Sequence, residues 1–190
     1  MKRLLPVLTI LLTLSYGASA QVVQWASKVI DFSSELTHAQ YSAQQALGKP
    51  NVMPAGGDNP NAWMPDKANR KEFLKLGFDK PMSIKQIAIA ESFNPSALYR
   101  ILVYDETGKE YELSTFNPMA IPMKGRMMNF FLEPTSYKVA AIKLEFDGAA
   151  VPDYYAIDAV AISDSNYPIV AFIPTPELLA SGIVTEVLDK

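Results

Sequence analysis

Two acidic residues of this chain occupy positions where the sequence predicts buried strands. Glu91 and Asp158 each alternate in step with the apolar residues of an amphipathic strand, so both side chains are expected to point inward. A buried carboxylate is costly unless it is paired or hydrogen-bonded. The two could bind calcium or form the acid pair of a glycoside hydrolase, because both chemistries use carboxylate oxygens. Alternatively, each accepts hydrogen bonds from backbone amides of a loop that has no strand partner.

The second candidate site is the loop GGDNPNAWMP at residues 56–65. Its glycines permit unusual backbone angles, its prolines stiffen the path, and Trp63 supplies a large apolar anchor with one N–H donor. The spacing of Asp58 and Asn61 resembles part of a calcium loop, but the glycine and the downstream glutamate of an EF-hand are missing. Three interpretations stay open. The loop is a structural strap held by the two inward carboxylates, or a calcium site that adds them to Asp58 and Asn61, or a ligand site contacted by Trp63.

Other catalytic and metal chemistries find little support in the sequence. The chain has no cysteine and a single histidine, His38, which lies in a polar stretch. A zinc or transition-metal site therefore lacks ligands, and a serine–histidine triad lacks its G-x-S-x-G motif. We expect no enzyme activity and no cofactor other than a candidate structural calcium.

Aromatic residues offer candidate contacts for a glycan. Trp63, Phe93, Tyr154 and Tyr155 could form the exposed platform on which a sugar ring stacks, and core packing is the competing interpretation for each of them. Adjacent residues of a strand face opposite ways, so at most one of the two tyrosines needs to be buried.

The elements that would position these residues are mostly strands. Apolar residues recur with a period of two, which is typical of half-buried antiparallel strands. The predicted strands cover residues 27–32, 74–78, 85–91, 99–104, 110–116, 127–133, 141–146 and 156–163. One short helix is predicted over residues 41–48, with Ser42 as its N-cap and Gly48 at its end. About eight short strands with turns between them predict an all-β sandwich.

The two ends of the chain differ from this body. Residues 1–20, MKRLLPVLTILLTLSYGASA, have a basic start, an apolar run and small residues before the predicted cleavage point, as in a secretory signal peptide. The sandwich is assigned to residues 21–165. Residues 166–190 contain three prolines, a candidate one-turn helix capped by Thr175 and an apolar stretch at 183–188, which together predict a linker or docking tail.

Charge and composition narrow the partners. The chain carries a net charge of −3 and becomes more acidic once Lys2 and Arg3 are removed with the signal peptide, so a nucleic-acid partner is not expected. The mature chain has no predicted transmembrane segment. An exported chain without cysteine fits a bacterial periplasm or cell surface.

The order and spacing of several segments resemble a galactose-binding-like, discoidin-related jelly-roll module. The segments are FSSEL (32–36), YSAQQALGKPNVMPAGGDNPNAWMP (41–65), EFLKLGF (72–78), IAIAESFNPSALYRILVYDETGKEYEL (87–113), PTSYKVAAIKLEFDG (134–148) and AIDAVAI (156–162). Similar patterns occur at the N-terminus of OmpA-family envelope proteins of Gram-negative bacteria. The resemblance implies an eight-stranded sandwich whose loops at one end bind sugars, lipids or proteins, often beside a structural calcium. It carries over Asp58, Asn61, Trp63, Glu91 and Asp158 as a cluster near that end.

These observations predict a noncatalytic binding or assembly module of the Gram-negative cell envelope. Its expected partner is a periplasmic or cell-surface glycan or an envelope protein complex. Two alternatives are a carbohydrate-active enzyme that uses Glu91 and Asp158, and a truncated N-terminal module of a larger OmpA-like, peptidoglycan-associated protein.

Overall fold

The computed structural model describes residues 21–171, and the structural statements below concern that range. Its strands are β1 (Val23–Trp25), β2 (Lys28–Phe32), β3 (Lys71–Met82), β4 (Gln86–Phe93), β5 (Leu98–Asp105), β6 (Glu110–Thr115), β7 (Arg126–Phe131), β8 (Val139–Asp147) and β9 (Ala156–Ser163). Two one-turn 3-10 helices, η1 (Ala43–Ala46) and η2 (Gly148–Ala150), complete the elements of this range. No helix within it is long and apolar enough to cross a membrane.

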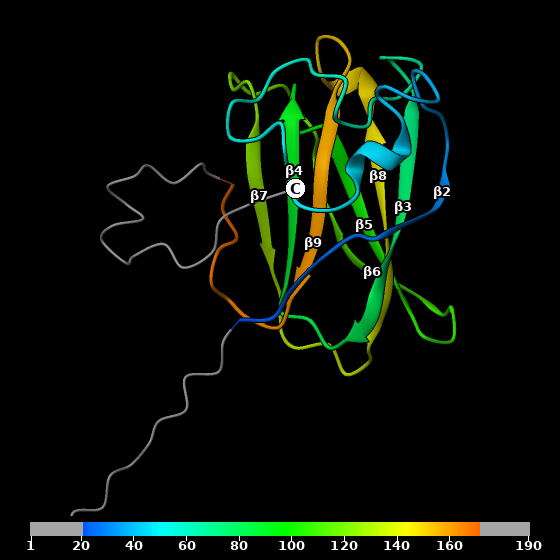
Figure 1. Ribbon diagram of the computed structural model, residues 1–190, viewed down its shortest axis with the longest axis vertical. Coiled ribbons are helices and arrows are strands. Elements are labelled where there is room, and N and C mark those ends of the chain that lie inside the picture. Colours follow the sequence, from blue (N-terminus) through cyan, green and yellow to red (C-terminus); the bar gives the residue numbers. More distant parts are fainter. Residues whose placement is uncertain (1–20, 172–190) are drawn as a thin grey trace, which may run out of the picture.

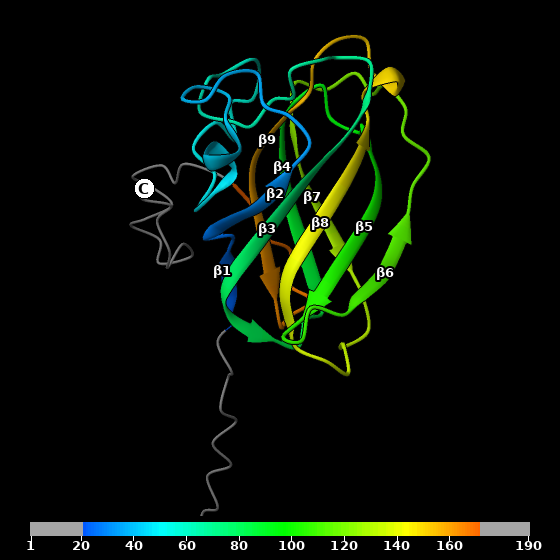
Figure 2. The same ribbon diagram turned by 90° about the vertical axis from the view of Figure 1, so that its right-hand side faces the viewer.

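The strands form two antiparallel sheets that pack face to face (Figure 1 and Figure 2). One sheet has the strand order β1-β9-β4-β7 and the other has the order β2-β3-β8-β5-β6. The predicted all-β jelly-roll sandwich is therefore confirmed. The eight predicted strands correspond to β2 through β9. Strands β4 and β9 are buried on both faces, because the N-terminal and C-terminal segments cover part of their outer face.

The core lies between the sheets and is built from those alternating residues. Leu74, Leu76 and Phe78 of β3 are buried, as are Ile142, Leu144 and Phe146 of β8. Ile87 and Ile89 of β4 join the same cluster together with Val160 and Ile162 of β9. Burial of this apolar area is the main stabilising contribution, since the chain has no disulfides.

Two local predictions differ from the structure. Strand β1 was not expected, because three residues are too few to display a period. The predicted helix at 41–48 is only the single turn η1, and the side chain of Ser42 does not cap it. Instead, the Ser42 hydroxyl donates to the carbonyl of Ala39.

The packed body also extends beyond the predicted boundary at residue 165. Ile169 and Ala171 are buried, and Ile169 packs against Ala88 and Ala161 on the outer face of the four-stranded sheet. Asn129 of β7 holds this segment, since its Oδ1 accepts from the Ile169 N–H (2.9 Å) and its Nδ2 donates to the Ile169 carbonyl (3.0 Å). The signal peptide at 1–20, the turn at Thr175 and the apolar stretch at 183–188 lie outside the described residues.

Candidate ligand-binding site

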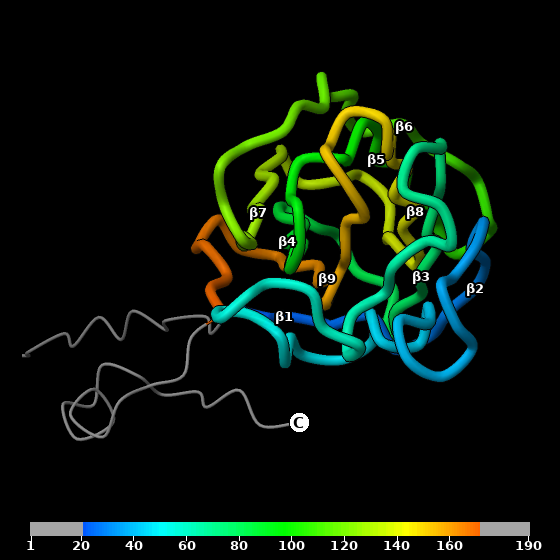
Figure 3. The backbone as a smooth tube through the Cα atoms, turned by 90° about the horizontal axis from the view of Figure 1, so that it is seen from above, coloured from blue at the N-terminus to red at the C-terminus, as the bar shows by residue number. Residues whose placement is uncertain are grey.

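The antiparallel strand directions place four connections, among them the three longest, at one end of the sandwich. Figure 3 looks down onto this loop end. The connections there span residues 33–70, 94–97, 116–125 and 148–155. The opposite end carries the connections 83–85, 106–109 and 132–138, none longer than seven residues, so the loop end is where chain segments far apart in sequence meet.

Glu91 and Asp158 lie together at the loop end, as the sequence predicted for antiparallel strands. Strands β4 and β9 pair antiparallel, and Glu91 is the register partner of Ile157, the residue next to Asp158. The exposed fraction is 1% for Glu91 and 0% for Asp158. Both acids are therefore removed from solvent, and each requires partners.

Backbone amides are the partners of Asp158. Its two oxygens accept hydrogen bonds from the N–H groups of Asn51, Val52 and Met53, at 3.0, 3.0 and 2.9 Å. Three such bonds to an ionised carboxylate satisfy three donors of a loop that has no strand ladder. The prediction that Asp158 anchors the loop 56–65 is wrong in position, because the anchored residues precede that loop.

Glu91 is held by an arginine and a turn. Its Oε2 forms an ion pair with Arg126 Nε, and its Oε1 accepts from the backbone N–H of Ser96 at 2.8 Å. Ser96 has a φ of 87°, so the carboxylate fixes a turn that an L-residue rarely adopts. Both inward acids thus have structural partners, in agreement with the second interpretation drawn from the sequence.

The predicted calcium ligands are not assembled into one set. Asp58 Oδ1 accepts from the hydroxyl of Tyr41 at 2.8 Å, and the exposed Asn61 donates its backbone N–H to Asn59 Oδ1. No group of three or more histidine, cysteine, aspartate or glutamate residues in the described range could hold a metal ion. The cluster of Asp58, Asn61, Glu91 and Asp158 therefore does not form a coordination site in this structure.

The loop 56–65 is closed by Trp63. Trp63 and Ile157 exchange both backbone hydrogen bonds, at 2.8 and 2.9 Å, and form an isolated bridge to β9. The indole is fully buried, packs at 5.4 Å from the ring of Phe146 and donates Nε1–H to the carbonyl of Ser34. Because it is buried, Trp63 cannot serve as an exposed platform for a ligand.

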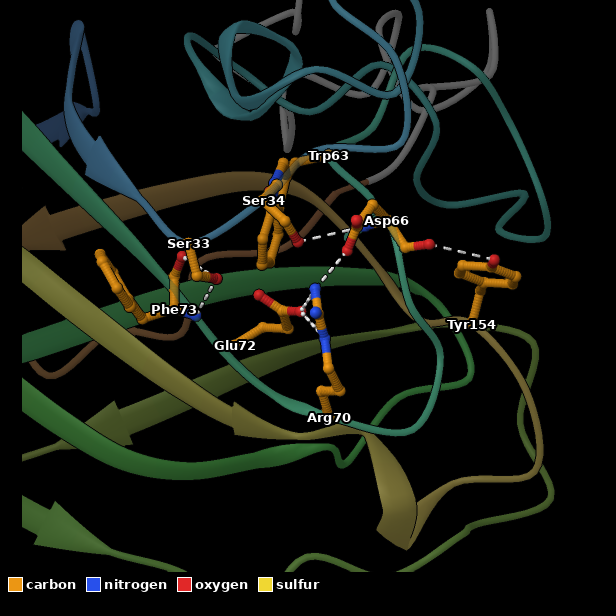
Figure 4. Close-up of polar contacts among 8 residues, drawn as sticks. All are labelled: Ser33, Ser34, Trp63, Asp66, Arg70, Glu72, Phe73 and Tyr154. Carbon is orange, nitrogen blue, oxygen red and sulfur yellow. Dashed lines mark hydrogen bonds and ion pairs between the residues drawn. The ribbon is translucent and has the colours of Figure 1, made fainter.

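A polar network fastens the chain on either side of this bridge (Figure 4). Arg70 pairs with both Asp66 and the buried Glu72, at 2.5 and 2.9 Å. The backbone N–H of Asp66 donates to the hydroxyl of Ser34 at 3.1 Å, and its carbonyl accepts from the hydroxyl of Tyr154 at 3.3 Å. These bonds link the start and the end of the long connection 33–70, so the network has a structural role.

The remaining aromatic candidates divide between core and surface. Tyr155 is 1% exposed, its hydroxyl has no hydrogen-bond partner among the described residues, and burial raises its pKa. Tyr154 is partly buried and bonded to Asp66, while Phe93 is partly exposed at the end of β4. Of the four predicted aromatic contacts, Phe93 lines the pocket formed by residues 56–57, 93–94 and 121–124.

That pocket has a volume of about 460 Å³ and opens at the loop end. Three segments line it: Gly56 and Gly57 of the strap loop, Phe93 and Asn94 after β4, and Ile121, Pro122, Met123 and Lys124 before β7. Its walls combine apolar side chains with one amide and one ammonium group, which is the general composition of a small ligand site.

Glycines let the three segments approach closely. Gly56 and Gly57 have positive φ angles of 63° and 107°, and the Gly57 N–H donates to the carbonyl of Ser92 at 2.6 Å. A Cβ on Gly125 would lie 2.9 Å from the carbonyl oxygens of Glu91 and Ser92, so only glycine fits there. At Gly56 and Gly125 backbone therefore packs directly against backbone.

The residues 121–124 were not predicted as part of a site. Their signal in the sequence is a run of apolar side chains, NPMAIPMKG, inside a stretch without strand periodicity, where Met119 and Met123 are 60% and 52% exposed. Apolar residues in an exposed loop can indicate a contact surface. Nothing local in the sequence places this loop beside Gly56 and Phe93.

The fold and the pocket together define a jelly-roll β-sandwich with a pocket at its loop end. The chain belongs to the family described as pappalysin-1, SD scarf domain, C-terminal, whose model matches residues 16–169. Among curated proteins, it is similar to F-box/LRR-repeat protein 4 of Bos taurus, with 25% identity over 178 residues. That match covers 76% of this chain and 29% of the bovine protein, so the chain spans less than a third of this relative.

Solved structures share the fold at low sequence identity. Reduced XRCC1 bound to the DNA polymerase β catalytic domain is similar with a TM-score of 0.56 and 14% identity, and the match covers 77% of this chain and 100% of that one. A family 32 carbohydrate-binding module of Streptococcus pneumoniae EndoD has a TM-score of 0.53 and 10% identity, and the match covers 73% of this chain and 95% of that one. A pectin-binding carbohydrate-binding module has a TM-score of 0.53 and 18% identity, and the match covers 75% of this chain and 94% of that one.

Proposed function

We propose that this chain is a noncatalytic binding module of the Gram-negative cell envelope that captures a glycan or a protein partner in its loop-end pocket. The observation that carries the proposal is the pocket itself, formed by Gly56 and Gly57, Phe93 and Asn94, and residues 121–124. A concave site built from three loops on a rigid sandwich is suited to binding. The carbohydrate-binding modules and the XRCC1 domain with the same fold support a binding role.

The inward acids give no support to a hydrolase. Asp158 is occupied by three backbone amides, and Glu91 by Arg126 and Ser96. Retaining and inverting glycosidases need one carboxyl group poised to protonate the leaving group and a second one facing the sugar. Since both carboxylates hold loops in place, binding without turnover is the better match to the geometry.

Export to the envelope is proposed from the N-terminal sequence. The basic start, the apolar run and the small residues of MKRLLPVLTILLTLSYGASA support secretion, and the resemblance to N-terminal modules of OmpA-family proteins supports an envelope setting. Fractionation of cells that express the full chain tests this part. Recovery in the cytoplasm, with residues 1–20 retained, would contradict it.

Site-specific photo-crosslinking tests the binding role. A photoreactive amino acid replaces Pro122 in the pocket wall, and in a matched control it replaces Thr107 in the turn at the opposite end. We expect adducts with an envelope glycan or protein from position 122 that are absent from position 107. Equal labelling from both positions would count against a pocket ligand, whichever class it belongs to.

A further inference from the structure

The pocket offers few hydrogen-bond donors to a hydroxyl-rich ligand. The N–H groups of Gly56 and Gly57 are committed to the carbonyls of Val52 and Ser92, at 3.1 and 2.6 Å. The side-chain amide nitrogen of Asn94 donates to the carbonyl of Tyr154 at 2.7 Å. A sugar bound here would find few free donors for its hydroxyl groups, and an unpaired buried hydroxyl weakens binding.

Apolar side chains account for four of the eight lining residues. Phe93 comes from the segment after β4, and Ile121, Pro122 and Met123 come from the segment before β7. Met119, two residues before Ile121 in the same loop, is exposed as well. Methionine is unbranched and adapts to irregular partners, and methionine and aromatic residues are enriched in protein–protein contacts.

One charged residue, Lys124, lines the pocket. It is the single ionisable residue of the lining, and it has no ion-pair partner within residues 21–171. The nearby Arg126 is already paired with Glu91. In a chain whose net charge is −3, a pocket lined by a free ammonium group and no acid is complementary to a carboxylate.

We propose that the pocket binds a peptide segment of a partner protein in which a large apolar side chain stands next to an acidic residue. The apolar side chain fills the space between Phe93 and Met123, and the carboxylate pairs with Lys124 at the rim. This inference rests on the proposed binding function and specifies its ligand as protein rather than glycan. Part of the segment would lie across Met119, outside the pocket.

Methionine-methyl NMR on the full chain with defined probes tests the proposal. The probes are the blocked dipeptide acetyl-Leu-Asp-amide, its neutral isostere acetyl-Leu-Asn-amide, galacturonate and methyl galactoside. We expect the first probe to shift the methyl signal of Met123 and to bind at least about threefold more tightly than the neutral isostere, as expected for an exposed ion pair. The preference should disappear in Lys124→Gln and weaken at high salt.

A matched variant separates the effect of the Lys124 charge in the pocket from the effect of the net charge of the chain. Lys80→Gln removes an exposed lysine at the opposite end of the sandwich and should leave the preference for the acidic probe unchanged. Saturation of the pocket methyl signals by either sugar, but not by the acidic dipeptide, would overturn the peptide inference and leave the binding function intact. Equal binding of the acidic and neutral dipeptides would also overturn it. Absence of both dipeptide binding and Pro122-specific adducts would remove the inference and the proposed function together.

Discussion

Trp63 and Ile157 exchange a pair of backbone hydrogen bonds, at 2.8 and 2.9 Å. Ile157 belongs to β9, whereas Trp63 lies in the loop 56–65, which contains no regular strand. This single bridge attaches the loop 56–65 to β9 and places the indole in the core beside Phe146. The unusual composition of the loop is therefore explained by closure of the fold. Its first two glycines contribute to the pocket, whereas its tryptophan does not.

Truncation of Trp63 should weaken the whole sandwich. Trp63→Ala creates a large cavity and is expected to cost about 3–5 kcal/mol of unfolding free energy. Trp63→Phe keeps most of the volume but leaves the Ser34 carbonyl without its N–H donor, so a cost of about 1–3 kcal/mol is expected. Denaturant unfolding followed by circular dichroism measures both. A loss below about 0.5 kcal/mol in Trp63→Ala, the usual range for surface substitutions, would contradict the bridge as a stabilising feature.

Asp158→Asn should be destabilising although the side chains are nearly isosteric. The neutral amide has one acceptor oxygen, so it cannot replace both oxygens that receive the N–H groups of residues 51–53. We expect a loss of about 2–4 kcal/mol, because hydrogen bonds to charged groups are strong and the N–H group of Val52 is buried. The exposed Asp153→Asn serves as the control and should unfold at the same denaturant concentration as the native chain. Equal midpoints for the two variants would refute the anchoring role.

Ile169 and Val170 provide a matched pair for the segment after β9. Ile169 is 7% exposed and packs on Ala88 and Ala161, whereas its neighbour Val170 is 52% exposed. Ile169→Ala is expected to lower stability by about 1–3 kcal/mol, and Val170→Ala by less than about 0.5 kcal/mol. Thermal denaturation of both variants makes the comparison. Identical melting temperatures would mean that the sandwich ends at residue 165, as the sequence predicted.

Asp105 should make the free energy of unfolding depend on pH in the acidic range. Its carboxylate accepts hydrogen bonds from the hydroxyl groups of Thr107 and Tyr111 and from the backbone N–H groups of residues 107 and 109. These bonds, the one from the Thr107 hydroxyl most of all, lower the pKa of Asp105 from 3.8 to about 2. A lowered folded-state pKa gives a contribution that is complete above the unfolded pKa and is lost as the pH falls from 3.8 toward 2. Asp105→Asn should therefore flatten this part of the pH–stability curve. Glu106→Gln, an exposed change in the same turn, should keep the native curve.

Calcium should leave the melting temperature unchanged. Asp58, Glu91 and Asp158 each have separate partners, and no cluster of acids in the described range could hold a metal ion. Differential scanning fluorimetry with millimolar calcium and with a chelator measures the effect, since a ligand that binds the native state raises its stability. A calcium-dependent rise that disappears in Asp58→Ala would restore the calcium site.

The strands and the inward acids could be predicted because their signals are local. A period of two places Glu91 on the buried face of its strand, and antiparallel pairing of β4 with β9 brings it to the same end as Asp158. The partners of those acids could not be predicted, because they are backbone amides of distant segments. Asn51 lies 107 residues before Asp158, and no side-chain pattern marks a backbone donor.

By itself, the sequence determined the sandwich, the burial of the two carboxylates and the exceptional character of residues 56–65. Alternation of apolar residues suffices to predict the strands and the inward direction of the two carboxylates, since each strand buries at least one face. The tertiary structure alone decided that Trp63 is core and that Gly57, Phe93 and Lys124 share a pocket. That decision depends on how three loops pack at one end of two sheets, which is a property of long-range contacts that neighbouring residues do not encode.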